Sequence, residues 1–239
     1  MDIVFFLIAF FSELVGTMAG FGSSTIFLPL ALLLVDFKTA LVLVAFLHIF
    51  GNLGRISFFR HGLDWNLILK FGIPSVLLTL IGALLVGYIP QEVLKGMLGV
   101  FLVVYAGLSL WKDTMQAKAN TLSAIIGGAI SGFLAGLIGT GGALRGAFLT
   151  AFRLPKEKYI ATAASIALAV DITRIPVYLS QGFLESQYYW YVPILFIIAF
   201  AGSFTGKQIV NRIPQKQFRK LVLLAIVFIG IKFVYDWLI

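Results

Sequence analysis

The sequence reads GTMAGFGSS from Gly16 to Ser24 and GLIGTGGA from Gly136 to Ala143. Each stretch falls near the middle of a long apolar run, the first over residues 3–35 and the second over residues 121–152. Glycine adopts backbone conformations that end an α-helix, including those with positive φ. Both runs are therefore predicted to form two half-helices joined at a glycine-rich break.

Six further apolar runs surround these two, at 38–59, 66–88, 93–111, 158–180, 188–206 and 218–238. Each is long enough to cross a hydrocarbon layer of about 30 Å as a helix. Hydrophobic residues make up 60% of the 239 residues, charged residues make up 12%, and the mean hydropathy is +1.02. A water-soluble domain of this length could not bury so much apolar surface. We therefore expect an all-α polytopic membrane protein.

The net charge of +8 does not point to a nucleic-acid partner. The basic residues lie in short loops between apolar runs, where the positive-inside rule expects topology signals. The chain has no cysteine, so disulfides, thiol chemistry and cysteine-ligated metals are excluded. We expect no cofactor and no metal.

The chain contains an internal repeat. A shift of 119 positions (139 − 20) aligns six residue pairs in one register. These pairs are Gly20 with Gly139, Gly22 with Gly141, Asn52 with Asp171, Arg55 with Arg174, Pro74 with Pro193 and Gly87 with Gly206. We predict a duplicated four-segment unit, 1–115 and 116–239, within one integral membrane domain.

The lysines and arginines near the segment ends indicate how the broken runs lie. They divide most unequally between the two sides of the membrane if both broken runs fold back as re-entrant hairpins instead of crossing. Each unit then has three true crossings, so the two repeats are inverted and both termini lie on the extracytoplasmic side.

Two glycine-rich tips meeting near the midplane would form an anion site. Their backbone N–H groups and half-helix N-termini favour negative charge, and hydroxyl groups add donors. The candidate residues are Gly20, Gly22, Ser23, Ser24, Thr25, Gly139, Thr140, Gly141 and Gly142. In the alternative interpretation, the glycines only permit tight helix packing.

Arg145 lies three residues beyond Gly142, well inside the membrane in a hairpin arrangement. A buried cation there requires a partner, a cavity or a ligand. We interpret Arg145 as an anion contact. The alternative is an internal ion pair with Glu13 or Asp171.

Asn52 with Arg55, and Asp171 with Arg174, are spaced three residues apart and share a helix face. Either pair could contact the substrate. Both arginines lie late in their segments, however, where long side chains can reach the headgroups. Asp171 is a candidate proton carrier or a partner of Arg174.

His48 and Glu13 are two further candidates for proton coupling. Histidine titrates near neutrality, and burial shifts the titration of a glutamate. The alternative for His48 is a hydrogen-bonded packing residue.

The glycine-rich stretches 16–24 and 136–143, with Leu28-Pro29 after the first, resemble the signatures of the TauE/SafE family of sulfite and organosulfonate exporters. The resemblance covers essentially the whole chain. It implies a prokaryotic plasma-membrane permease for sulfite, an organosulfonate or a related anion. Ser23 and Ser24 stand where the family often has glycine, so the two tips differ.

These observations predict a secondary transporter of a small anion that works by alternating access, and not an enzyme. Its partners would be the anion and the lipid bilayer, with a homodimer left open. The alternatives are a passive anion channel and a membrane-embedded enzyme similar to lipid pyrophosphate phosphatases.

Overall fold

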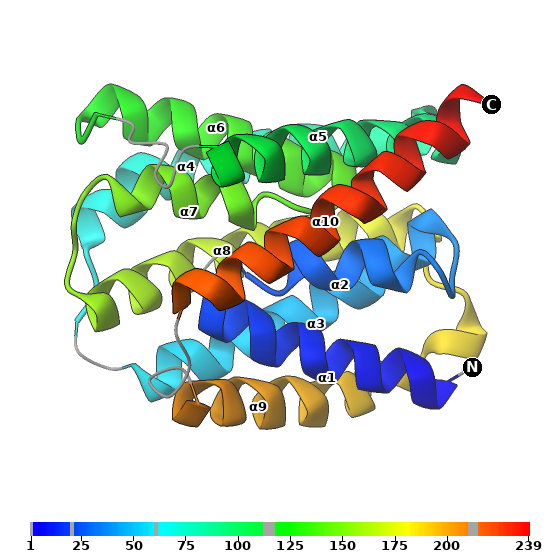
Figure 1. Ribbon diagram of the computed structural model, residues 1–239, viewed down its shortest axis with the longest axis horizontal. Coiled ribbons are helices and arrows are strands. Elements are labelled where there is room, and N and C mark those ends of the chain that lie inside the picture. The colour runs from blue at the N-terminus through cyan, green and yellow to red at the C-terminus, as the bar shows by residue number, and fades with distance from the viewer. Residues whose placement is uncertain (1, 20–21, 60–61, 112–117, 210–214) are drawn as a thin grey trace.

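The computed structural model describes residues 2–19, 22–59, 62–111, 118–209 and 215–239, and the regular elements in these ranges are helices (Figure 1). The α-helices are α1 (Asp2–Ala19), α2 (Ser24–Ala31), α3 (Phe37–Phe58), α4 (Trp65–Leu85), α5 (Gln91–Trp111), α6 (Thr121–Ile138), α7 (Gly142–Thr150), α8 (Lys156–Ser180), α9 (Tyr191–Ile209) and α10 (Gln215–Leu238). Two short 3₁₀ helices, η1 (Val86–Tyr88) and η2 (Ser186–Tyr188), follow α4 and precede α9.

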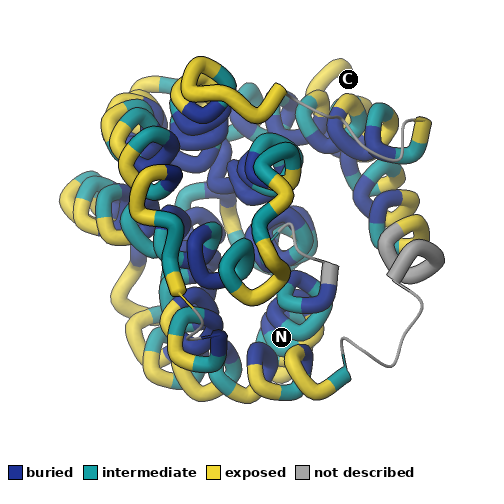
Figure 2. The backbone as a smooth tube through the Cα atoms, turned by 90° about the vertical axis from the view of Figure 1, so that its left-hand side faces the viewer, coloured by how far each residue is buried: buried dark blue, intermediate teal, exposed yellow. Residues whose placement is uncertain are grey.

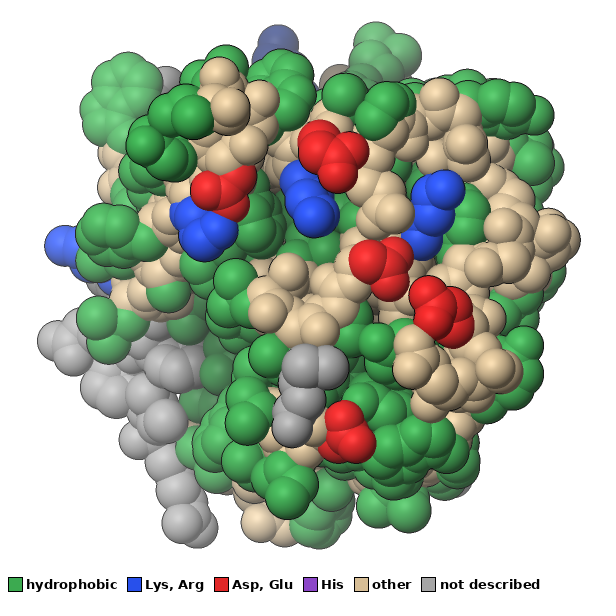
Figure 3. All heavy atoms as spheres, turned by 90° about the vertical axis from the view of Figure 1, so that its right-hand side faces the viewer, with side chains coloured by type: hydrophobic (Ala, Val, Ile, Leu, Met, Phe, Trp, Pro, Cys, Tyr) green, Lys and Arg blue, Asp and Glu red, His purple; other side chains and the backbone are tan. Residues whose placement is uncertain are grey.

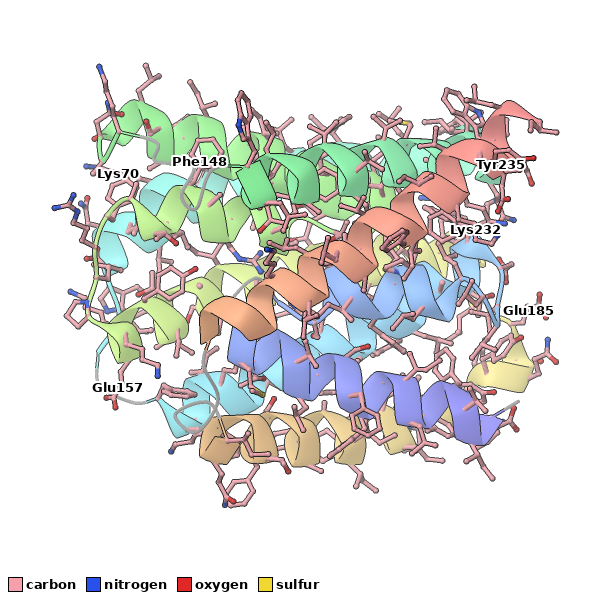
Figure 4. The ribbon with its side chains drawn as sticks, viewed as in Figure 1. Lys70, Phe148, Glu157, Glu185, Lys232 and Tyr235 are labelled. Atoms are coloured by element: carbon pink, nitrogen blue, oxygen red, sulfur yellow. The ribbon has the colours of Figure 1, made fainter. Side chains whose placement is uncertain are left out.

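The helices run roughly along one direction, the horizontal of Figure 1. Within the described residues, seven helices are long and apolar enough to cross a membrane. Labelled charged side chains lie at the two ends of the bundle, Lys70 and Glu157 at one end and Glu185 and Lys232 at the other (Figure 4). The chain is a multi-pass membrane protein, so the predicted fold class is confirmed.

The outward faces of the outer helices are exposed, whereas their inward faces are buried (Figure 2). On α4 the exposed face is apolar, because Leu69, Ile73, Leu77 and Leu84 recur there at helical spacing. An apolar exposed face is stable in contact with lipid and not with water. The bilayer therefore solvates this surface.

Both long apolar runs break at the predicted glycine-rich stretches. The first break separates α1 from α2 and the second separates α6 from α7. Gly22 has φ +83° and Gly139 has φ +73°, which side-chain-bearing residues rarely adopt. In Figure 1, α1 runs inward from the end that holds both termini and α2 returns to it, while α6 and α7 do the same from the opposite end.

Glycines allow α6 to lie directly against α4. A Cβ atom at Gly128, Gly132 or Gly136 would lie 2.2 Å from a backbone carbonyl oxygen of α4. In return, hydroxyl groups of α4 donate to carbonyl oxygens of α6, Ser75 to Gly128 and Thr79 to Gly132, each at 2.9 Å. Such small-residue contacts and interhelical hydrogen bonds stabilise helix pairs in membranes.

The helix bounds and contacts of the two halves can be compared under the shift of 119 residues. The 119-residue shift carries the bounds of α1, 2 and 19, onto those of α6, 121 and 138. Just as α4 packs on α6, α9 packs on α1, and Gly202 and Gly206 of α9 approach the backbone of α1. Between these pairs, α3 contacts α8, and α5 pairs with α10.

Candidate functional site

A cavity of about 40 Å³ lies between the two helix breaks, α3 and α8. This volume holds roughly three water molecules or one small anion. Its walls are formed by Gly16, Thr17, Gly22, His48, Asn52, Arg55, Gly142, Arg145, Gly146, Tyr159, Ile160, Ala163 and Ala164. Both breaks therefore contribute to one site.

Arg55 on α3 is paired with Glu13 on α1. Its guanidinium donates from Nη2 to Glu13 Oε1 and from Nη1 to Asn52 Oδ1 at 2.8 Å. Arg55 Nε also donates to Thr17 Oγ1 at 3.2 Å, and Ser203 Oγ donates to Glu13 Oε1 at 2.7 Å. The side chain of Arg55 is buried, with 6% of the residue exposed, so it does not extend to the headgroups.

Asp171 on α8 is the centre of a second buried network. Arg174 donates from Nε to Asp171 Oδ1 at 2.9 Å, and its Nη2 lies 2.8 Å from the same oxygen. His48 Nδ1 lies 2.9 Å from Asp171 Oδ2, to which Asn52 Nδ2 donates at 3.3 Å. Asn52 thus connects the Asp171 network to the Arg55 network.

Arg174 also holds the end of α6. Its Nη1 atom donates to the carbonyl oxygens of Ala135 at 2.8 Å and Gly139 at 3.0 Å. Tyr178, one helical turn further along α8, donates to Gly136 O at 2.6 Å. Carbonyl groups at a helix C-terminus lack intrahelical partners, so these donors stabilise the second break.

Arg145 on α7 lines the cavity and is buried, with 6% exposed. Within the part of the chain that the structure describes, its guanidinium has no hydrogen bond and no ion pair, to Glu13, Asp171 or any other residue. Among the described residues, no side chain therefore forms a direct pair with this buried cation.

The two breaks touch each other. Thr25 Oγ1 and Thr140 Oγ1 are hydrogen-bonded at 2.9 Å, although they are 115 residues apart. A Cβ atom at Gly22 would lie 3.2 Å from His48 Nε2, 3.9 Å from Gly142 Cα and 4.0 Å from Arg145 Nη2. The absence of a side chain at Gly22 therefore keeps the space in front of the histidine and the arginine open.

The predicted site residues differ in where they lie relative to the cavity. Six of them line the cavity: Gly22, His48, Asn52, Arg55, Gly142 and Arg145. Another eight lie behind its walls: Glu13, Ser23, Ser24, Thr25, Gly139, Thr140, Asp171 and Arg174. Gly141 contacts the carbonyl group of Ser131 and supports packing, and Gly20 lies outside the described residues.

Sequence reasoning missed the wall formed by α8. Tyr159, Ile160 and Ala164 line the cavity together with residues of the breaks. A signal existed, because Ile160 and Ala164 lie eleven and seven positions before Asp171, which places all three on one helix face. Thr17, within the first glycine-rich stretch, was also missed.

Comparison with known proteins agrees with this architecture. A family model described as "Sulfite exporter TauE/SafE" matches residues 5–233. The chain is similar to a "Probable membrane transporter protein" of Methanocaldococcus jannaschii, with 25% identity over 236 residues that cover 89% of this chain and 88% of the relative. No solved structure matches the chain.

Proposed function

The chain belongs to the TauE/SafE family of membrane transporters, and from this premise we propose that it is a secondary transporter of a small anion, sulfite or an organosulfonate. The anion is held in the cavity between the two helix breaks. The family description supports the sulfur-containing substrate, and the charge of the site supports an anion.

The observation that carries this proposal is the charge balance of the buried groups. Among the described residues, the buried charged side chains besides His48 are three arginines and two carboxylates. Arg55 is paired with Glu13 and Arg174 with Asp171. Arg145 remains, so the site carries one excess positive charge when His48 is neutral. A buried uncompensated cation is costly, and a bound anion removes that cost.

The helix break beside Arg145 supplies further anion contacts. Gly142 is the first residue of α7, and the first N–H groups of a helix have no intrahelical partner. Such N–H groups and the helix dipole favour an oxyanion. Arg145 follows within the same first turn, so one short segment provides both kinds of donor.

The proposed mechanism is alternating access by two inverted repeats. The two hairpins enter from opposite ends of the bundle (Figure 1), and their tips are in contact through Thr25 and Thr140. Rocking one repeat against the other would expose the cavity first to one side and then to the other. A channel would instead conduct without this motion, and its flux would not saturate at transporter-like rates.

We infer the orientation from the charged ends. Lys70 lies at the end opposite the termini (Figure 4), where α6 and α8 begin and α7 ends (Figure 1). At or next to these helix ends lie Lys118, Arg153, Lys156 and Lys158. At the end that holds the termini, acidic and basic side chains are interspersed (Figure 3). By the positive-inside rule, the first end faces the cytoplasm of a prokaryotic cell and both termini face outward.

Replacing Arg145 tests the proposed function. We expect Arg145→Gln to lose binding of sulfite and of sulfonates, measured by isothermal titration calorimetry in detergent, and to lose uptake into proteoliposomes. Arg153→Gln is the matched control, because Arg153 is exposed and the change in net charge is the same. The proposal fails if purified Arg145→Gln binds these anions with the wild-type affinity.

A further inference from the structure

His48 presents an unused nitrogen atom to the cavity. The residue is 3% exposed and lines the cavity wall. Its Nδ1 atom is hydrogen-bonded to Asp171, while its Nε2 atom has no hydrogen-bond partner within the described part of the chain. An ionised carboxylate only accepts hydrogen bonds, so Nδ1 carries the hydrogen and Nε2 has a free lone pair.

This nitrogen atom and Arg145 face the same small space. An atom at the position of a Gly22 Cβ would lie 3.2 Å from His48 Nε2 and 4.0 Å from Arg145 Nη2. Both groups line the same small cavity, so an oxyanion held in that cavity faces the nitrogen atom and the guanidinium. It would accept a hydrogen bond from Nε2 only if that nitrogen were protonated.

We propose that the site binds a doubly charged oxyanion together with one proton, and that the proton resides on His48 Nε2. The inference rests on the function proposed above. With neutral His48 the buried groups sum to one positive charge, which a singly charged sulfonate balances. With protonated His48 they sum to two, which a dianion such as sulfite or thiosulfate balances. The histidine thus couples one proton to each dianion.

Neither buried carboxylate fits this role as well. Glu13 is paired with Arg55, and Asp171 is paired with Arg174. A proton on either carboxylate would leave its arginine without a counter-charge in a buried site, which is costly. A proton on His48 instead gains a charge-assisted hydrogen bond to Asp171.

The groups around His48 explain why the proton and the anion bind together. The charged and titratable groups that face it are Asp171, Arg174 and Tyr159 on α8, Arg145 on α7, Arg55 on α3 and Glu13 on α1. By charge alone, the Asp171 carboxylate favours a proton on His48, whereas the guanidinium groups of Arg145 and Arg55 in the same cavity wall oppose it. An anion that compensates Arg145 removes much of this opposition, and by reciprocity the proton strengthens anion binding.

Calorimetry can measure the bound proton directly. We would titrate the purified full-length protein with thiosulfate and with methanesulfonate at pH 8, in buffers of different ionisation enthalpy. Thiosulfate binding should take up about one proton per anion, and methanesulfonate binding should take up none. The thiosulfate affinity should fall about tenfold per pH unit in the range where free His48 is neutral, as linkage requires for one proton.

Replacing the histidine assigns the proton. In His48→Gln, proton uptake with thiosulfate should vanish, and the affinity for thiosulfate should fall by a larger factor than the affinity for methanesulfonate. His61→Gln, the same change at the other histidine of the chain, should retain the uptake. Thiosulfate binding without proton uptake, or with uptake that persists in His48→Gln, overturns this inference and leaves the proposed function standing. No binding of thiosulfate, sulfite or methanesulfonate to the wild type refutes the proposed function itself.

If His48→Gln does not fold, the wild-type pH series decides. Thiosulfate and methanesulfonate affinities that change equally with pH contradict a proton bound with the dianion alone. A steep dependence for thiosulfate and a flat one for methanesulfonate support it.

Discussion

Asp171→Asn should be among the most destabilising single changes in this chain. The carboxylate has no exposed surface and contacts Arg174, His48 and Asn52 at 2.8 to 3.3 Å. The amide would leave the Arg174 guanidinium buried without a counter-charge, for which removal of one ion-pair partner costs about 3–5 kcal/mol. At about 2–4 °C per kcal/mol for a chain of this size, we expect Tm to fall by about 6–20 °C.

Thermal unfolding in detergent, followed by tryptophan fluorescence, measures this loss. Asp236→Asn is the matched control, because the same change there disrupts only an exposed pair with Lys232 and should cost under about 1 kcal/mol. Adding Arg174→Met to Asp171→Asn removes the uncompensated charge and should recover part of the loss. Equal Tm values for the Asp171→Asn and Asp236→Asn variants would refute the buried-pair reasoning.

Two glycine substitutions test packing and the cavity. Gly132→Ala places a Cβ 2.2 Å from Ser75 O and should cost about 1–3 kcal/mol of stability, whereas Gly107→Ala, which meets nothing within 4 Å, should be neutral in the same thermal assay. Gly22→Ala fills the space in front of the cavity's histidine and should weaken anion binding at least tenfold by calorimetry; Gly62→Ala, at a similar φ in open space, should leave binding unchanged. Wild-type binding by Gly22→Ala would place the anion elsewhere.

Much of the fold could be predicted from the sequence, because lipid imposes simple rules on apolar length. Uninterrupted apolar runs correspond to helices, and the glycines at 22 and 139 correspond to backbone at positive φ. The contact between α4 and α6 was not predicted. Gly128, Gly132 and Gly136 recur at helical spacing, but this pattern alone does not say which neighbouring helix they face.

The sequence predicted which residues belong to the site better than it predicted which of their side chains contact one another. The spacing of Asp171 and Arg174 indicated a pair, and the structure contains that pair. The contact of Glu13 with Arg55 joins residues 42 positions apart, and that of His48 with Asp171 joins residues 123 apart. The periodicity of a single helix carries no information about contacts between residues so far apart in the sequence. The packing of separate helices determines which of these residues meet. Both buried carboxylates of the described residues pair with other arginines, so neither is left to pair with Arg145.

Glu13 acquires its neighbours in the order in which the ribosome supplies them. Arg55 follows it after 42 residues, whereas Ser203 follows only after 190. Chains emerge from the ribosome N-terminus first, so α3 can neutralise the carboxylate early, while the face of α1 that packs on α9 stays uncovered until the second repeat is nearly complete. Until α9 has been synthesised, that face of α1 therefore lacks the helix that covers it in the folded protein.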